Sequence, residues 1–263
     1  MRTSTLRQMT ALGTSGGLES RQGTTAFHLP PHTLIDAGTG VQTLDHEALA
    51  LLDHVLLTHA HLDHVAALPL LIDSQFDMRA EQQRPLRVYA LPEVLESLGQ
   101  HLFNDHIWPD FTRLPSREKA VLRLVPVIPG QPVTLSQKPN DAIRVTPFLV
   151  SHGVPTCGYC LSDGTEQIAI CGDTGLSKIT IASLNDLGPL QRLIIECAYS
   201  NRADALAKTC QHLTPKRLAR LLDTLKTLPE ELWITHLKPS QREHIIDELS
   251  QQLPACLKWT LPL

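Results

Sequence analysis

The sequence predicts an α/β fold in which helices cover a sheet, and three observations support this prediction. Short strand-like segments come in pairs near the start of the chain, and strands then alternate with helical segments. Several of the later strands end directly in a histidine or an acidic residue. A chain of 263 residues can bury a sizeable core, and we expect one domain over residues 1–263.

The first elements are short strands next to a glycine-rich loop. A strand from Leu6 to Leu12 is expected to run into Gly13-Thr14-Ser15-Gly16-Gly17, where the glycines allow a ligand to approach the backbone closely. Strands over 24–29 and 33–36 follow, separated by two prolines. A helix over 45–52 then leads to the next strand.

The chain is organised around the motif Thr58-His59-Ala60-His61-Leu62-Asp63-His64, which follows the apolar run Val55-Leu56-Leu57. It places three imidazoles and a carboxylate within six residues. Alternate residues of an extended strand end point to one side, so His59 and His61 can converge on one metal ion. Asp63 and His64 turn towards a neighbouring position as a helix begins. The motif therefore predicts two metal ions, and its ligand types suit zinc, with manganese or iron also tolerated.

The segment after the motif is predicted to be mainly helical. Apolar residues over 65–76 indicate a buried helix broken or kinked near Pro69, and a strand over 86–91 precedes a helix over 92–103. The loop over 104–111 then carries two aromatic residues in a chain with few of them. This loop is either a wall over the site or a hydrophobic plug beneath a loop.

The second half of the chain repeats one pattern, a strand that ends in a residue able to bind metal. The stretch over 120–150 reads as β-structure with turns at 129–130 and 139–141, and its last strand, over 143–151, delivers His152. Strands over 167–171 and 232–235 end at Asp173 and His236 in the same way. Such residues gather along one edge of a sheet, which favours a ligand role for each of them.

Two further residues accompany this pattern. Glu196 ends the strand over 192–197, and His212 stands just before Thr214-Pro215, an N-cap followed by proline at the first helical position. A capping role alone explains this stretch adequately. The helix that starts there is expected to reach Leu225, and a helix over 240–253 and a strand over 256–261 complete the fold.

Composition excludes several classes of function. With 23 Lys and Arg against 27 Asp and Glu, the net charge of −4 disfavours a long nucleic-acid partner, although it does not disfavour a small anion held by metals. There is no apolar run of membrane-spanning length and no hydrophobic signal core at the start, so we expect a cytoplasmic protein without membrane association. Cys157 and Cys160 are expected to be small packed residues, because alternation along a strand need not bring their sulfurs together.

Taken together, the motifs resemble those of a metallo-β-lactamase-fold hydrolase, and more closely those of the class II 3′,5′-cyclic-nucleotide phosphodiesterases. The resemblance spans essentially the whole chain and implies an αββα sandwich of two mixed sheets covered by helices. The Cys157 and Cys160 stretch departs from the family pattern, and the N-terminus lacks the export signal that some members carry. The matching segments are Gly13 to Gly17, His59 to Val65, Ile107 to Phe111, Gly172 to Gly175, Ile195 to Cys197, His212 to Pro215 and Thr235 to Ser240.

The resemblance also implies roles for individual residues. His59, His61 and His152 would hold one zinc, Asp63, His64 and His236 the second, and Asp173 would bridge the two. A hydroxide shared by the metals would then open 3′,5′-cyclic AMP to 5′-AMP. We hypothesise that His212, oriented by Glu196, protonates the leaving 3′ oxygen and that Asp63 helps to align the water. Asn104, His106 and Trp108 are candidates for the nucleoside pocket.

Three alternatives stay open at this point. A transfer-RNA 3′-processing endonuclease also combines a Glu and a His after the bridging Asp, but it would need a basic arm that grips RNA. A thioesterase or a β-lactamase could use the same metals and would leave Glu196 and His212 unexplained. The chain could also be a silent cyclic-nucleotide-binding module or a metal-dependent scaffold. The sequence does not decide between cyclic AMP and cyclic GMP, and it does not show whether the chain forms a homodimer.

Overall fold

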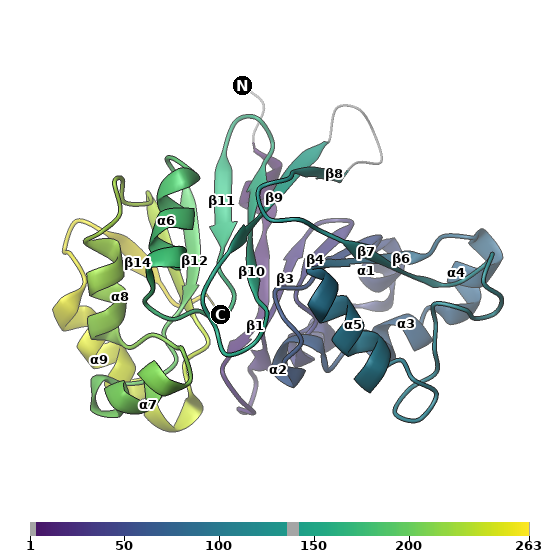
Figure 1. Ribbon diagram of the computed structural model, residues 1–263, viewed down its shortest axis with the longest axis horizontal. Helices are drawn as coiled ribbons and strands as arrows, with labels where there is room; N and C mark the ends of the chain where they lie inside the picture. The colour runs from purple at the N-terminus through teal and green to yellow at the C-terminus, as the bar shows by residue number, and fades with distance from the viewer. Residues whose placement is uncertain (1–3, 136–141, 263) are drawn as a thin grey trace.

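A computed structural model describes residues 4–135 and 142–262 of the chain. Within these residues the strands form two mixed seven-stranded sheets, with strand order β2-β1-β3-β4-β5-β6-β7 in the first and β14-β13-β12-β11-β10-β9-β8 in the second. Helices of the N-terminal half lie on one flank and helices of the C-terminal half on the other, with the strands between them (Figure 1). The predicted αββα sandwich is confirmed.

The N-terminal half supplies the first sheet. Strands β4, β5, β6 and β7 run parallel, whereas β3 is antiparallel to both β1 and β4. The elements, with η for short 3₁₀ helices, are η1 (Thr5–Gln8), β1 (Thr10–Ser15), β2 (Gly23–Thr24), β3 (Ala26–Leu29), β4 (Thr33–Ile35), η2 (Thr39–Thr43), α1 (His46–Leu51), β5 (His54–Leu56), α2 (Leu62–Val65), α3 (Leu68–Asp73), α4 (Phe76–Gln82), β6 (Leu86–Ala90), α5 (Pro92–His101) and β7 (Leu122–Pro126).

The C-terminal half supplies the second sheet. Strands β11 to β14 run parallel, and β8, β9, β10 and β11 pair antiparallel. The elements are β8 (Val133–Leu135), β9 (Ile143–Leu149), β10 (Cys157–Ser162), β11 (Gln167–Ile170), α6 (Lys178–Asp186), β12 (Arg192–Glu196), η4 (Asn201–Ala203), α7 (Asp204–Thr209), α8 (Pro215–Leu222), β13 (Glu231–Thr235), η5 (Pro239–Gln241), α9 (Arg242–Gln252) and β14 (Lys258–Thr260).

Alternation along β10 divides the core between its two faces. Cys157 and Tyr159 join the apolar cluster that also contains residues of the first sheet, whereas Cys160 joins the cluster beneath the C-terminal helices. Both cysteines are buried free thiols, so the sulfurs do not converge, as predicted. The Tyr159 hydroxyl lies within hydrogen-bond distance of the carbonyl oxygens of Leu57 and Tyr89, at 2.8 and 3.0 Å, and so links the two sheets.

Three predicted elements need correction. The strand expected from Leu6 begins only at Thr10, because a 3₁₀ turn capped by the Ser4 hydroxyl precedes it, and it continues to Ser15. The helix expected over 65–76 is divided into α2, α3 and α4, with Pro69 in the first turn of α3. The helix expected to reach Leu225 ends at Leu222.

The turn expected at 129–130 is present, with Gly130 in the left-handed region at φ 81°. The turn expected at 139–141 lies outside the described residues. Helix α6 begins after Ser177, whose side chain accepts a hydrogen bond from the Thr180 amide. This helix was not predicted from the sequence.

Candidate metal centre

The predicted ligands lie at the carboxyl ends of strands from both sheets. Each of these strands is followed by a loop or by the start of a helix, so the side chains lie just beyond the paired strands, at one edge of each sheet. The motif from His59 to His64 follows β5 in the first sheet, and His152, Asp173 and His236 follow β9, β11 and β13 in the second.

One cluster combines three histidines with Asp173. One ligand atom from each of His59, His61, His152 and Asp173 lies within 4.8 Å of the others. The nitrogens His61 Nδ1 and His152 Nε2 are 3.3 Å apart. The oxygen Asp173 Oδ2 lies 3.7 Å from His59 Nε2 and 3.8 Å from His152 Nε2.

A second cluster lies beside the first and faces the other oxygen of the same carboxylate. It consists of Asp63, His64 and His236, whose ligand atoms also lie within 4.8 Å of one another. The oxygen Asp173 Oδ1 lies 3.3 Å from both His64 Nε2 and His236 Nδ1. Asp173 therefore turns one oxygen to each cluster, which is the geometry a bridging carboxylate requires.

The donor atoms of these clusters fit a divalent metal. His59 Nε2, His64 Nε2 and His236 Nδ1 are buried and have no hydrogen-bond partner within the described part of the chain. Buried polar atoms are normally paired, so three nitrogens without a hydrogen-bond partner around one carboxylate fit the binding of a divalent cation. Burial lowers the pKa of His59 well below its ordinary value and that of His152 to about 4, which favours the neutral imidazole that binds metal.

The imidazoles are oriented by partners on their outer side. The Nδ1 atom of His59 lies 3.0 Å from Thr58 Oγ1, that of His64 2.7 Å from Asp36 Oδ2, and that of His152 3.2 Å from the Gln211 carbonyl oxygen. These contacts hold the proton on Nδ1 and leave Nε2 free to bind a metal.

Asp36 is a site residue that our reading of the sequence did not identify. It is fully buried, and it accepts hydrogen bonds from the Thr58 amide (2.8 Å) and from the Thr58 hydroxyl (2.8 Å). Its backbone is in the left-handed region at φ 57°, as is that of His236 at φ 61°. A signal was present, because Asp36 is the last residue of the strand predicted over 33–36.

His212 and Glu196 form a buried pair next to both clusters. His212 Nδ1 lies 2.5 Å from Glu196 Oε1, and Glu196 also accepts hydrogen bonds from the amides of Thr174, Ala198 and Leu213. Burial lowers the pKa of His212, but the carboxylate of Glu196 raises it more, so the pKa lies above its ordinary value. Its ring stacks on that of His236, with centroids 5.5 Å apart.

A cavity of about 380 Å³ opens beside these side chains. Tyr199 and Lys238, which the sequence did not single out, contribute to its wall. The Lys238 ammonium donates to the Gly16 carbonyl oxygen at 2.6 Å. The lining residues are His61, Asp63, His152, Gly153, Val154, Asp173, Tyr199, Cys210, His212, His236 and Lys238.

The glycine-rich loop approaches the protein's own backbone at this site. A Cβ atom on Gly16 would lie 2.4 Å from the His236 carbonyl oxygen, and the Gly16 amide donates to Leu237 at 3.1 Å. The close approach that these glycines allow therefore fixes the turn that carries His236.

The three candidates for the nucleoside pocket lie in the loop after α5. The Asn104 carboxamide oxygen accepts from the amides of His106 and Ile107, so this side chain shapes the turn, and the Trp108 indole nitrogen is buried. Among the described residues, the lining of the 380 Å³ cavity does not include any of the three. Their contact with substrate stays a prediction.

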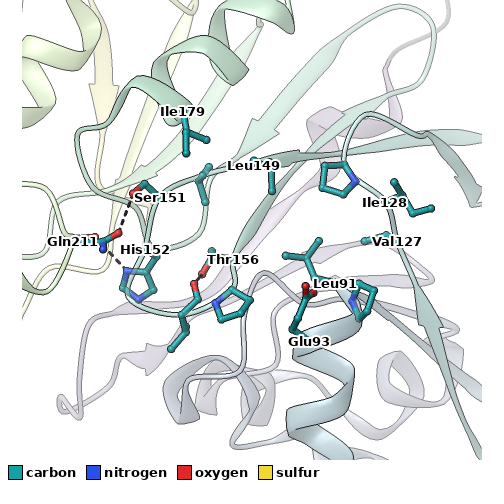
Figure 2. Close-up of a pocket in the computed structure, with 15 residues that line it drawn as sticks. Leu91, Glu93, Val127, Ile128, Leu149, Ser151, His152, Thr156, Ile179 and Gln211 are labelled. Atoms are coloured by element: carbon teal, nitrogen blue, oxygen red, sulfur yellow. Dashed lines mark hydrogen bonds between the residues drawn. The ribbon is translucent and has the colours of Figure 1, made fainter.

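A second cavity, of about 620 Å³, adjoins the first and shares His152 and Val154 with it. Figure 2 shows His152 at one end of this cavity and Leu91, Val127 and Ile128 at the other. Its lining residues are Leu91, Pro92, Glu93, Val127, Ile128, Pro129, Leu149, Val150, Ser151, His152, Val154, Pro155, Thr156, Ile179 and Gln211.

Comparison with known families and proteins agrees with this geometry. The family model of the β-lactamase superfamily domain matches residues 32–237, which include all the predicted ligands. The chain therefore belongs to the family described as the β-lactamase superfamily domain.

Similar proteins include two that are named 3′,5′-cyclic-nucleotide phosphodiesterases and one that is named ribonuclease Z. Over 230 residues the chain is 27% identical to 3′,5′-cyclic-nucleotide phosphodiesterase 1 of Saccharomyces cerevisiae, covering 73% of this chain and 59% of the relative. Over 224 residues it is 29% identical to a probable 3′,5′-cyclic-nucleotide phosphodiesterase of Yersinia pestis, and the match covers 74% of this chain and 61% of the relative. Over 186 residues it is 27% identical to ribonuclease Z of Staphylococcus aureus, covering 64% and 55%. The chain thus matches about three-fifths of the length of the first two relatives.

Solved structures show the same superfamily fold. Unliganded yeast PDE1 matches with a TM-score of 0.76 and 19% identity, covering 97% of both chains. The metallo-β-lactamase fold protein YhfI of Bacillus subtilis matches with a TM-score of 0.74 and 18% identity, covering 97% and 96%. The short form of human tRNase Z matches with a TM-score of 0.63 and 18% identity, covering 89% and 93%. Within residues 4–135 and 142–262, no helix has the length and apolar character needed to cross a membrane.

Proposed function

We propose that this chain is a metal-dependent phosphodiesterase that hydrolyses 3′,5′-cyclic nucleotides. The observation that carries phosphodiester hydrolysis is the position of the His212–Glu196 pair, which adjoins two ligand clusters that share Asp173. A bimetal site without this pair would support hydrolysis in general. The pair adds a proton donor for a leaving alkoxide, as a cyclic phosphodiester requires. The names of the two phosphodiesterase relatives support the same substrate class.

The ligand clusters define where two divalent ions would be held. One ion would be held by His59, His61 and His152. The other ion would be held by Asp63, His64 and His236, and Asp173 would contribute to both. When bound, such ions activate water and offset charge on the phosphate oxygens. The ligand set of imidazoles and carboxylates suits zinc, with manganese or iron as alternatives.

In this proposal His212 acts on the leaving group. Because its Nδ1 atom is held by Glu196, its Nε2 atom is the one available to the cavity. As water adds to phosphorus, the bond from phosphorus to the 3′ oxygen breaks, and His212 gives its Nε2 proton to that oxygen. The product is a nucleoside 5′-monophosphate, and the proton lost by the water passes to solvent. Asp63, at the edge of the cavity, is positioned to orient the attacking water.

Lys238 supplies positive charge to the same cavity. Its ammonium group is fixed by the Gly16 carbonyl oxygen and lies in the wall beside His236. A dianionic product or a monoanionic cyclic phosphate is stabilised by such a charge. The site therefore suits a small anion, in agreement with a chain whose net charge of −4 disfavours a long polynucleotide.

The second candidate is a tRNA-processing endonuclease, which the similarity to ribonuclease Z favours. Both candidates use the same ligand clusters and the same Glu–His pair. They differ in the substrate that the surface outside the clusters accepts, so the substrate must be tested directly.

The test of the proton-donor role is the variant His212→Ala. We expect turnover of cyclic AMP to fall by about 100-fold or more, the range for loss of a general acid, while metal content stays at the wild-type level. The matched control is His101→Ala, at the end of α5 and outside both cavities. Parallel loss of metal and activity in His212→Ala would show that His212 acts structurally and would refute the proposed role.

A further inference from the structure

The 620 Å³ cavity is the feature that the proposed reaction leaves unused. It shares His152 and Val154 with the cavity at the ligand clusters, so a molecule whose phosphate lies at the clusters can extend directly into it. Its volume falls within the range of sites that bind small organic ligands, roughly 300–1,000 Å³. A nucleoside attached to that phosphate would be held on the side of His152 that faces this cavity.

The rim of the cavity is apolar and open to water. Ile128, Leu149 and Ile179 are 53%, 44% and 54% exposed, and they come from three separate parts of the chain. Figure 2 shows the three side chains along one side of the cavity. Exposed branched side chains that converge on a hollow favour a flat apolar ligand that removes them from water.

Most polar groups of the cavity wall already have partners within the protein. The Ser151 hydroxyl donates to the Gln211 carboxamide oxygen at 2.9 Å, and the Thr156 hydroxyl donates to the Val154 carbonyl oxygen at 2.9 Å. These pairs need nothing from a ligand. Because both hydroxyl donors are already used, these two groups do not direct a ligand, and the apolar rim favours the flat faces of an aromatic ring system.

Glu93 differs from these groups because it carries a negative charge. It is a solvent-exposed residue in the first turn of α5 that lines the cavity, and within the described residues its carboxylate has no hydrogen bond or ion pair, so it is free to accept from a ligand. A carboxylate only accepts hydrogen bonds. The Watson–Crick edge of guanine offers two adjacent donors, N1–H and the 2-amino group, and so matches both oxygens. Adenine offers the 6-amino donor beside the acceptor N1, which would face a carboxylate oxygen without a proton between them.

We propose that this cavity binds the nucleobase of the cyclic nucleotide and that Glu93 makes it favour guanine over adenine. This inference rests on the proposed phosphodiesterase function and adds its base specificity. It predicts a kcat/KM for cyclic GMP that is about tenfold higher than that for cyclic AMP, near the lower end of the discrimination given by one bidentate base contact.

The first test replaces the charge of Glu93. In Glu93→Gln the amide offers one acceptor and one donor, which match the 6-amino group and N1 of adenine. We expect the preference for guanine to disappear or to reverse in kcat/KM and in the dissociation constants of 5′-GMP and 5′-AMP, measured by titration calorimetry. Glu96→Gln, one turn further along α5 and outside the cavity lining, is the matched control and should keep the wild-type ratio.

The second test changes the rim. Leu149→Asn should raise KM for cyclic GMP about fivefold or more, because it removes apolar contact with the base. Leu51→Asn is the matched control, since Leu51 is 45% exposed and lies at the end of α1, away from the cavity. Metal content should be the same in Leu149→Asn and the wild type, because Leu149 belongs to neither ligand cluster.

Failure of the proposed function and failure of the base site alone give different results. A wild-type protein that does not hydrolyse any 3′,5′-cyclic nucleotide would refute the proposed function, and the base site with it. A wild-type protein that hydrolyses them, with an unchanged base preference in Glu93→Gln or an unchanged KM in Leu149→Asn, would refute the base site alone. A shift of KM in His106→Ala, without one in Leu149→Asn, would move the base to the loop after α5.

Discussion

The variant Asp36→Asn tests how the protein holds one ligand in its metal-binding form. Asp36 is fully buried and accepts from the Thr58 amide, the Thr58 hydroxyl and, at 2.7 Å, His64 Nδ1. The amide of asparagine has a single acceptor oxygen, so one of these donors must face its NH₂ group. If that donor is His64, the imidazole moves its proton to Nε2 and can no longer bind a metal through that atom. If it is Thr58, a buried amide loses its partner.

The magnitude follows from these contacts. Loss of an outer partner of a histidine ligand typically weakens metal affinity by about 10- to 100-fold, or ~1.4–2.7 kcal/mol. A buried donor without a partner costs about 1–3 kcal/mol of folding stability. We therefore expect Asp36→Asn to retain the metal held by His59, His61 and His152 and to lose the one held by His64.

The assay is metal content by mass spectrometry after dialysis against buffered zinc, with urea unfolding in parallel. Asp45→Asn is the matched control, because Asp45 caps α1 with its side chain and belongs to neither ligand cluster. Asp45→Asn should keep both metals. If Asp36→Asn also binds two metals with wild-type affinity, the tautomer of His64 does not depend on Asp36 and the reasoning is wrong.

Three further predictions concern stability. Gly158→Ala should lower the free energy of unfolding by about 1–3 kcal/mol, because its Cβ would lie 2.3 Å from Phe148 Cζ; Gly99→Ala, with open space around it, should be neutral or stabilising in the same urea titration. Burial raises the pKa of Asp163, but hydrogen bonds, chiefly from the Ser4 hydroxyl, lower it below the ordinary value. Because the folded-state pKa is the lower one, the stability contributed by Asp163 is present above about pH 4 and is lost as the pH falls. Asp163→Asn should therefore lower Tm at pH 7, and this loss should become smaller as the pH falls below about 4 towards the folded-state pKa, whereas a loss that does not shrink between pH 7 and pH 2 would contradict this assignment. Removal of bound metal with a chelator should lower Tm of the wild type, since it leaves buried imidazole nitrogens unpaired again, and an unchanged Tm would argue against metal at the clusters.

Much of the site follows from local sequence patterns. His152, Asp173 and His236 each come directly after an apolar strand, and parallel strands meet at one edge, so their convergence on the motif at 59–64 was predictable. The αββα architecture followed from resemblance to a known fold family. Periodicity by itself predicted only a sheet covered by helices.

The parts that the sequence did not predict depend on tertiary contacts. Gln211 orients His152 through its backbone carbonyl, which carries no information about residue type. The left-handed backbone of Asp36 is set by the surrounding structure and was not signalled by a glycine. The 620 Å³ cavity combines residues from α5, α6 and β9 with the loops between them, and such a surface exists only after the chain has folded.

The most direct test of the proposed phosphodiesterase function compares two substrates with the same zinc-loaded protein. One is a 3′,5′-cyclic nucleotide, assayed by release of the 5′-monophosphate, and the other is a precursor tRNA with a 3′ trailer. Asp173→Ala serves as the inactive control for both. We predict rapid opening of the cyclic nucleotide, no cleavage of the precursor tRNA, and loss of activity in Asp173→Ala. Cleavage of the precursor tRNA without turnover of the cyclic nucleotide would contradict the proposal and identify the chain as an endonuclease.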